Sequence, residues 1–137
     1  MTPEAKVKAS VVKLLKKHEI YYFFPATHGF GRSGVPDIIC CFDGGFLALE
    51  IKAGDNKPTA LQDREMNRIF DAGGHAYVIN EDEVANLDEW IRLRRAHKEV
   101  KNKTLENFDK LRKKMDAFRA SRAKEDVMTV PKKGKNV

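Results

Sequence analysis

The sequence predicts an α/β fold in which helices flank a mixed central sheet. Segments with helical periodicity alternate with short runs rich in apolar and β-forming residues. A hairpin gives an antiparallel pair, and a strand–helix–strand unit gives a parallel pair through its crossover, so both kinds of pairing are expected. In chain order, the predicted elements are a helix at 3–18, a strand at 21–24, a hairpin at 36–52, a helix at 60–72, a strand at 76–79 and a helix at 82–97.

The helices carry start and stop signals in the sequence. Thr2 and Pro3 suit the cap and the first position of the first helix. Thr59 and Gln62 fit a capping box at the start of the second helix, and the glycines at 73–74 end it. The apolar residues expected to pack are Val7, Val11, Leu14 and Leu15 in the first helix, Leu61, Met66, Ile69 and Phe70 in the second, and Leu87, Trp90 and Ile91 in the third.

The hairpin is predicted to turn at the Gly-Gly pair 44–45. This two-residue loop sets Asp37 opposite Lys52 and Ile39 opposite Glu50. Because side chains alternate with period two, the aspartate, the glutamate and the lysine then project from one face. A loop one residue longer or shorter would put the two carboxylates on opposite faces. The other face should form core, with Ile38, Cys40, Phe42, Leu47, Leu49 and Ile51.

Two carboxylates and one ammonium on one face of an apolar hairpin are unusual, because strands are poor in Asp, Glu and Lys. One interpretation is a site for a hard cation, since carboxylate oxygens suit Mg²⁺ together with water and phosphate oxygens. Lys52 could then orient or deprotonate a water, or stabilise developing charge. The other interpretation is a surface ion pair between Asp37 and Lys52, which would contribute little to stability. Spacing alone leaves both open.

Pro36-Asp37, twelve intervening residues and then Glu50-Ile51-Lys52 resemble the PD-(D/E)XK nuclease signature. The glycine-rich segment 31–39 resembles the approach to the first motif in VRR-NUC domains. The motif Thr59-x-x-Gln62, and the glycines 73–74 before a Val-Ile strand, follow the same family order. The resemblance covers roughly residues 3 to 90, and archaeal-type Holliday junction resolvases share much of it. It implies a restriction-endonuclease-like α/β core with a mixed central sheet.

The resemblance also implies roles for individual residues. Asp37, Glu50 and the backbone carbonyl of Ile51 would bind Mg²⁺ or Mn²⁺, and Lys52 would be the catalytic lysine. Two further residues, Gln62 and Glu4, would complete the pocket. Both also have simpler explanations, because the glutamine fits a helix cap and the glutamate suits a helix N-terminus. The loop 26–35 would bring Arg32 and His28 near the metal.

The function implied is a metal-dependent endodeoxyribonuclease acting on branched DNA, with the four-way (Holliday) junction as leading substrate. Two symmetric nicks need two active sites, so a homodimer is expected. Alternatives are a monomeric flap or repair nuclease and a DNA-binding module that keeps the nuclease fold without the chemistry. A third possibility makes the basic C-terminal segment a docking arm for a partner protein.

Charge divides the chain unevenly. Residues 1–91 contain 10 Lys and Arg against 14 Asp and Glu, whereas residues 92–137 contain 16 against 6. A basic segment of this kind supplies sequence-independent attraction to phosphates, although charge runs are usually solvated helix faces. The predicted organisation is a nuclease core at 1–97, a basic amphipathic helical extension at 98–126 and a flexible basic tail at 127–137. The apolar face of the extension comprises Leu105, Phe108, Leu111, Met115 and Phe118.

The remaining composition excludes other classes of protein. No apolar run is long enough to cross a membrane, and the N-terminus lacks the apolar region of a signal peptide. Cys40 and Cys41 lack metal-ligand spacing and are expected to be small buried apolar residues on opposite faces of a strand. The expected location is intracellular, in the cytoplasm or nucleoid, which includes a phage protein inside a bacterial host.

Overall fold

The computed structural model describes residues 1–26 and 31–129, with side chains described as far as Glu125. His28 and residues 130–137 of the predicted tail lie outside this range. The elements are α1 (Pro3–Lys17), β1 (Tyr21–Phe23), β2 (Ile38–Phe42), β3 (Gly45–Ile51), α2 (Ala60–Asp71), β4 (His75–Ile79) and α3 (Glu83–Thr129).

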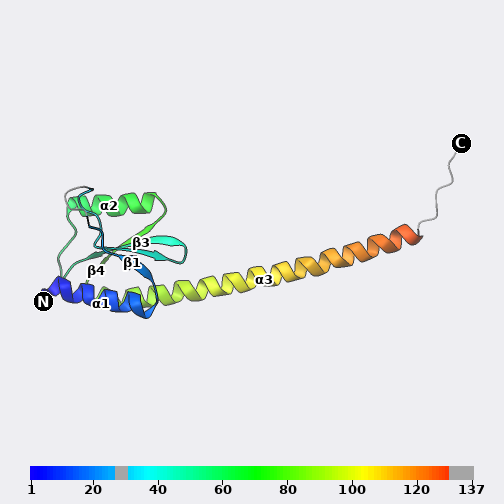
Figure 1. Cartoon of the computed structure of the whole chain (residues 1–137), viewed down its shortest axis with the longest axis horizontal. Coiled ribbons are helices and arrows are strands. Elements are labelled where there is room, and N and C mark those ends of the chain that lie inside the picture. The colour runs from blue at the N-terminus through cyan, green and yellow to red at the C-terminus, as the bar shows by residue number, and fades with distance from the viewer. Residues whose placement is uncertain (27–30, 130–137) are drawn as a thin grey trace. The chain divides into compact units, whose positions relative to one another are not determined.

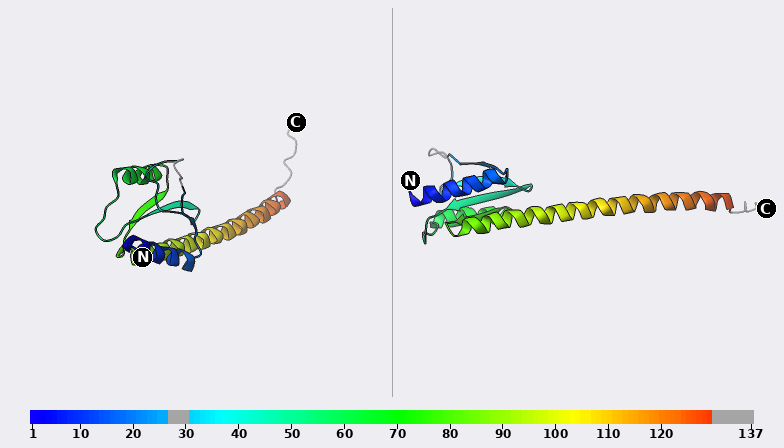
Figure 2. Two further views of the ribbon diagram at one scale, coloured as in Figure 1. Left: turned by 60° about the vertical axis from the view of Figure 1, so that its left-hand side comes forward. Right: turned by 90° about the horizontal axis from the view of Figure 1, so that it is seen from below.

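The four strands form one mixed sheet in the order β1-β2-β3-β4. The first three strands pair antiparallel, and β4 pairs parallel to β3 after the α2 crossover. Helix α2 covers one face of the sheet, whereas α1 and the first turns of α3 cover the other (Figure 1). The left-hand view in Figure 2 shows the same three layers. The predicted α/β fold with a mixed, helix-flanked sheet is confirmed.

Two hydrophobic clusters lie on opposite faces of the sheet. The larger packs α1 and the start of α3 against the sheet, with Val11, Leu15 and Ile91 fully buried. The smaller lies beneath α2 around Ile39 and Met66. The hairpin face predicted to be core is buried in the larger cluster, with all six of its residues: Ile38, Cys40, Phe42, Leu47, Leu49 and Ile51.

The predicted hairpin register was wrong by two residues. The turn uses Asp43 and Gly44 rather than the two glycines, so Ile39 lies opposite Ala48 and not opposite Glu50. Both turn residues have positive φ, 57° at Asp43 and 76° at Gly44, as the favoured Asp-Gly turn of a two-residue hairpin requires. Gly45 therefore enters β3. A shift of two residues preserves the alternation, so the carboxylates stay on one face.

Three smaller predictions also differ from the structure. Cys41 is exposed, although it does point away from the face that buries Cys40. Leu61 and Phe70 on α2 are each about half exposed, at 50% and 47%, because the sheet face beneath this helix holds only a small apolar cluster. Helix α3 continues without a break from Glu83 to Thr129, which follows from the absence of glycine and proline in that range.

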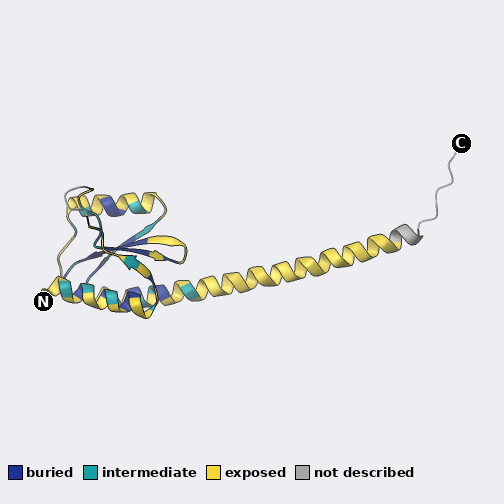
Figure 3. Ribbon diagram, in the orientation of Figure 1, coloured by how far each residue is buried: buried dark blue, intermediate teal, exposed yellow. Residues whose placement is uncertain are grey.

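The chain divides into two compact units, Met1–Arg95 and Ala96–Val137. In the first unit, α3 contributes Leu87 and Ile91 to the core. In the second unit, every residue from 96 to 125 is exposed (Figure 3). In the part of the chain that the structure describes, no helix is both long and apolar enough to cross a membrane.

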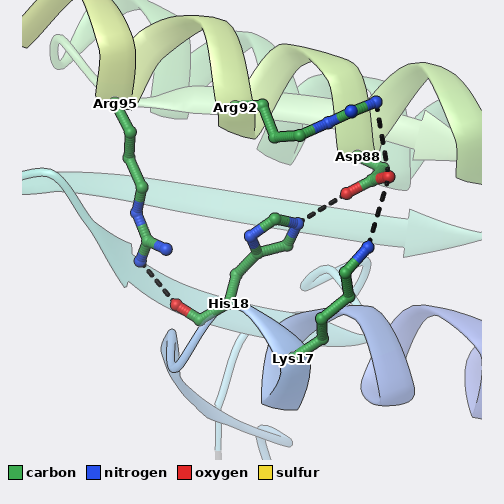
Figure 4. A network of polar contacts seen from close by, with 5 residues as sticks. All are labelled: Lys17, His18, Asp88, Arg92 and Arg95. Atoms are coloured by element: carbon green, nitrogen blue, oxygen red, sulfur yellow. Dashed lines mark hydrogen bonds and ion pairs between the residues drawn. The ribbon is translucent and has the colours of Figure 1, made fainter.

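A polar network on the first unit joins the C-terminal end of α1 to α3 (Figure 4). Asp88 pairs with His18, and it also forms ion pairs with Lys17 at 3.7 Å and Arg92 at 3.6 Å. The hydrogen bond with His18, followed by these neighbouring cations, lowers the pKa of the Asp88 carboxyl. Arg95 donates to the backbone oxygen of His18. These contacts anchor the first turns of α3 beside α1.

Ile91→Ala tests the contribution of α3 to the core. Removing this fully buried side chain should lower the free energy of unfolding by about 2–5 kcal/mol, since the cavity cannot refill. Leu93→Ala on the same helix, where the side chain is 63% exposed, should change stability by only about 0.5 kcal/mol. Urea unfolding of both variants gives the comparison. Equal losses would contradict the placement of α3.

Candidate active site

Asp37 and Glu50 meet at one end of the two central strands, β2 and β3. Asp37 immediately precedes β2, and its Oδ2 accepts a hydrogen bond of 2.8 Å from the backbone N–H of Ile51 in β3. Continuing the observed hairpin register by one residue places Asp37 opposite Glu50. The predicted pairing of Asp37 with Lys52 is therefore replaced by a direct apposition of two carboxylates.

Glu50 is the most buried acid of the described residues, at 2% exposure. Its Oε1 accepts a hydrogen bond of 2.7 Å from Gln62 Nε2 and lies 3.8 Å from Lys52 Nζ. Its Oε2 is buried and has no hydrogen-bond partner among the described residues. Burial, followed by the charge of Asp37, raises the pKa of the Glu50 carboxyl to about 7, although Lys52 opposes the shift.

Gln62 combines the two roles that the sequence left as alternatives. Its side-chain Oε1 accepts a hydrogen bond of 2.8 Å from the Thr59 backbone N–H, and the backbone N–H of Gln62 donates to Thr59 Oγ1 at 3.3 Å. This is the predicted capping box at the start of α2. The Nε2 end of the same amide donates to Glu50. The helix cap therefore fixes the side chain that holds the buried carboxylate.

The glycine-rich segment packs closely against the start of α2 at Gly34, a contact that sequence reasoning missed. A Cβ on Gly34 would lie 2.6 Å from the backbone carbon and oxygen of Leu61 and 2.9 Å from the nitrogen of Gln62. The backbone at Gly34 has φ +81°, which also favours glycine. The glycine-rich sequence could have signalled a close approach, but not the helix that it approaches.

Glu65 is a second buried acid that sequence reasoning missed. It is 7% exposed and lies three residues after Gln62, hence on the same side of α2. Arg32 Nη1 lies 3.9 Å from its Oε2, and Arg68 Nη1 lies 3.7 Å from its Oε1. Arg32 thus links the glycine-rich segment to α2. A helical projection from Gln62 would have singled out Glu65.

The other predicted residues take different positions. Lys52 is largely buried, with a side chain 13% exposed, and its backbone N–H donates to the Ile79 oxygen at 3.1 Å. The Ile51 side chain lies in the large core, so only its backbone is available to a ligand. Glu4 is exposed, and its negative charge is the weakest contribution to the raised pKa of Glu50. The structure thus gathers Asp37, Glu50, Lys52 and Gln62, with Glu4 related to them by charge alone.

The arrangement fits a hard cation. The buried Oε2 of Glu50 has no hydrogen-bond partner among the described residues, and a divalent cation shared with the neighbouring Asp37 carboxylate would satisfy it. In the described part of the chain, no group of three or more His, Cys, Asp and Glu side chains could hold a metal. Two carboxylates suit Mg²⁺, which keeps several waters and also binds substrate phosphate, better than a closed zinc site.

Comparison with solved structures identifies the fold. One structure described as a VRR_NUC domain superposes with a TM-score of 0.57 at 23% identity, covering 65% of this chain and 97% of that one. A second, described as a VRR_NUC domain protein, gives a TM-score of 0.55 at 21% identity and covers 66% of this chain and 86% of that one. No family model and no curated protein matches the sequence. The chain therefore has the VRR-NUC fold that its motifs predicted.

The raised pKa of Glu50 predicts how stability depends on pH and on metal. Between the ordinary pKa of 4.5 and the folded value of about 7, the folded protein keeps a proton that the unfolded chain releases. The metal-free protein should therefore lose stability as pH rises through this window, by up to about 3 kcal/mol, and Mg²⁺ should restore it above pH 7. Urea unfolding at about pH 5 and about pH 8, with EDTA or Mg²⁺, measures both effects.

Glu50→Gln is the control for this prediction, because an amide of the same shape does not titrate. The variant should lose most of the pH dependence in that window and all of the response to Mg²⁺. A variant as sensitive to pH and Mg²⁺ as the natural protein would show that other groups are responsible.

Proposed function

We propose that the protein is a Mg²⁺- or Mn²⁺-dependent, structure-specific endodeoxyribonuclease that hydrolyses phosphodiesters in branched DNA. The observation that carries this proposal is the buried Glu50 carboxylate, with one oxygen unpartnered beside Asp37 and within 3.8 Å of Lys52. A fold stabilised only by its packing would gain from an apolar residue here. A buried acid held by Gln62 is instead typical of a site built for chemistry.

The residues divide the proposed reaction among them. Asp37, Glu50 and the Ile51 carbonyl would hold the cation, which supplies water activation and neutralises phosphate charge when bound. Lys52 Nζ would orient the attacking water or accept its proton. Gln62 keeps the Glu50 carboxylate in position through its 2.7 Å hydrogen bond. Glu4 adds negative charge at the margin of the site.

Attraction to DNA would come from the second unit. Residues 96–137 contain 13 Lys and Arg against 6 Asp and Glu, and residues 96–125 are exposed throughout. Phosphate contacts of this kind bind without regard to sequence and offset the repulsion from the acidic site. The proposed substrate is a four-way junction, with a flap as the alternative. A DNA-binding module without chemistry is disfavoured by the burial of Lys52 against Glu50.

A homodimer is the second part of the proposal, and the exposed face of α3 supports it. Phe108, Leu111, Met115 and Phe118 recur at alternating steps of three and four, which is the spacing of a coiled-coil seam, and each is 48–64% exposed. Water-exposed aromatic and aliphatic side chains in such a row favour pairing with a second copy. The flanking positions are basic: Arg112, Lys114 and Arg119.

The test of the catalytic proposal is cleavage of matched junction, flap and linear duplex DNA with Mg²⁺ or Mn²⁺. Junction cutting should require metal and should fall at least about 100-fold in Lys52→Ala, because the water loses its activating group. The control is Lys57→Ala, which removes an exposed lysine five residues further along the chain and should cut normally. Cutting of flaps but not of junctions would favour the alternative, a flap or repair nuclease. Binding without cleavage in either protein would overturn the catalytic proposal.

The test of the dimer exploits opposite responses to salt. Screening of the flanking Arg and Lys charges should tighten a coiled-coil dimer between about 0.1 M and about 0.5 M salt, whereas DNA binding should weaken over the same range. Sedimentation velocity should show Leu111→Asp to be monomeric and the off-seam control Ala117→Asp to be dimeric. A natural protein that stays monomeric at both salt concentrations would contradict the dimer and favour a flap nuclease or a docking arm.

A further inference from the structure

A groove of about 320 Å³ opens directly beside the candidate active site. It reaches from α1, past the end of β1, to the glycine-rich segment that leads into β2. Asp37, a proposed metal ligand, is one of its lining residues, so the groove and the site share a wall. The other side chains that the argument uses are Lys8, Phe24, Arg32 and Ser33.

The groove combines two cations with an exposed aromatic ring. Phe24 is 47% exposed, although a phenylalanine gains by burial, and the Nζ of Lys8 lies 4.1 Å from its ring centroid. Lys8 forms no ion pair with a carboxylate among the described residues. The Arg32 side chain is 63% exposed, and its contact with Glu65 is long, at 3.9 Å. Both cations are therefore available to an anionic ligand.

This combination matches the chemistry of a nucleotide that is not in a double helix. Phosphate groups are bound by Lys and Arg, whereas an unstacked base binds an aromatic face. A base inside a double helix is stacked on its neighbours and offers no free face to a ring, so Phe24 would distinguish an unpaired, unstacked nucleotide from one inside a duplex. The placement beside Asp37 matters, because a strand with one phosphate at the metal site must continue through neighbouring space.

We propose that this groove binds an unpaired nucleotide next to the phosphodiester that is cut. Lys8 and Arg32 contact its phosphate, Phe24 stacks on its base, and Ser33 offers a hydroxyl to either. The inference rests on the proposed nuclease function and extends it. It assigns the recognition of DNA structure to the first unit, whereas the basic second unit contributes attraction that does not depend on structure.

The experiment measures binding of the full chain to two DNA probes, with Ca²⁺ in place of Mg²⁺ so that binding is separated from cleavage. One probe is a junction that carries an unpaired 2-aminopurine at the branch, and the other is a fully paired duplex of the same length. Phe24→Ala should weaken binding to the branched probe about tenfold and abolish the quenching of 2-aminopurine, because the stacking partner is lost. Binding to duplex should change less than twofold.

Matched variants separate this result from a folding defect. Phe70→Ala removes a phenylalanine that is also 47% exposed but lies outside the groove, and it should bind both probes normally. Phe24→Tyr keeps a ring and should retain the quenching. Lys8→Gln should weaken binding to the branched probe several-fold, whereas Lys13→Gln on the same helix should leave it unchanged.

The inference and the nuclease proposal fail in different ways. If Phe24→Ala binds each probe as tightly as Phe70→Ala does, the groove does not bind an unpaired nucleotide, whatever the cleavage assay shows. If Phe24→Ala loses binding to the branched probe but the natural protein cuts no DNA with any metal, the groove stands and the nuclease function is wrong. Equal losses on duplex and branched DNA would also overturn the inference, because they would indicate general phosphate binding.

Discussion

The buried carboxylate of Glu50 is the constraint on which the rest of the site depends. A charge at 2% exposure is unfavourable unless its oxygens are satisfied, and here only Oε1 has partners, Gln62 and Lys52. Burial, followed by the charge of the neighbouring Asp37, makes ionisation harder and raises the pKa of Glu50 to about 7. In the metal-free site, the surrounding packing therefore keeps the two carboxylates close together although their charges repel. This is the pattern expected where a fold gives up stability to prepare for a ligand.

The packing that resists this strain comes from both faces of the sheet. Behind β3, the large core fixes Leu49 and Ile51 on either side of Glu50, so the strand cannot rotate the carboxylate toward water. In front of it, α2 is fixed by its capping box and by the close approach of Gly34. A contact chain thus runs from the glycine-rich segment through the start of α2 to Gln62 and the acid. Displacing the glycine-rich segment or the start of α2 would move the Gln62 amide, which is the only neutral hydrogen-bond donor to Glu50 among the described residues.

The sequence predicted the faces of the hairpin better than its register. Faces follow from period two alone, and any even shift preserves them, so Asp37 and Glu50 were placed together correctly. The register depended on which two of three consecutive residues form the turn, and the Gly-Gly pair concealed the Asp-Gly turn that the positive φ angles favour. Gln62 was assigned two competing roles because a sequence cannot show that the two ends of one amide serve different partners. The contacts of Gly34 with the start of α2 and of Arg32 with Glu65 join segments about 30 residues apart, which no local pattern encodes.

The distribution of charge separates attraction from chemistry in the proposed enzyme. The unit Met1–Arg95 has a net charge of −1, and the unit Ala96–Val137 has +7. A site that must keep two carboxylates side by side cannot also be the main source of attraction for phosphates, because the same acids that bind a cation repel DNA. Placing the excess of Lys and Arg on the exposed part of α3 would remove this conflict, since nonspecific phosphate contacts made there would leave the charge around Glu50 unchanged. In this proposal, the structure of the DNA is distinguished near the site itself, where Lys8, Arg32 and Phe24 line the groove that begins at Asp37.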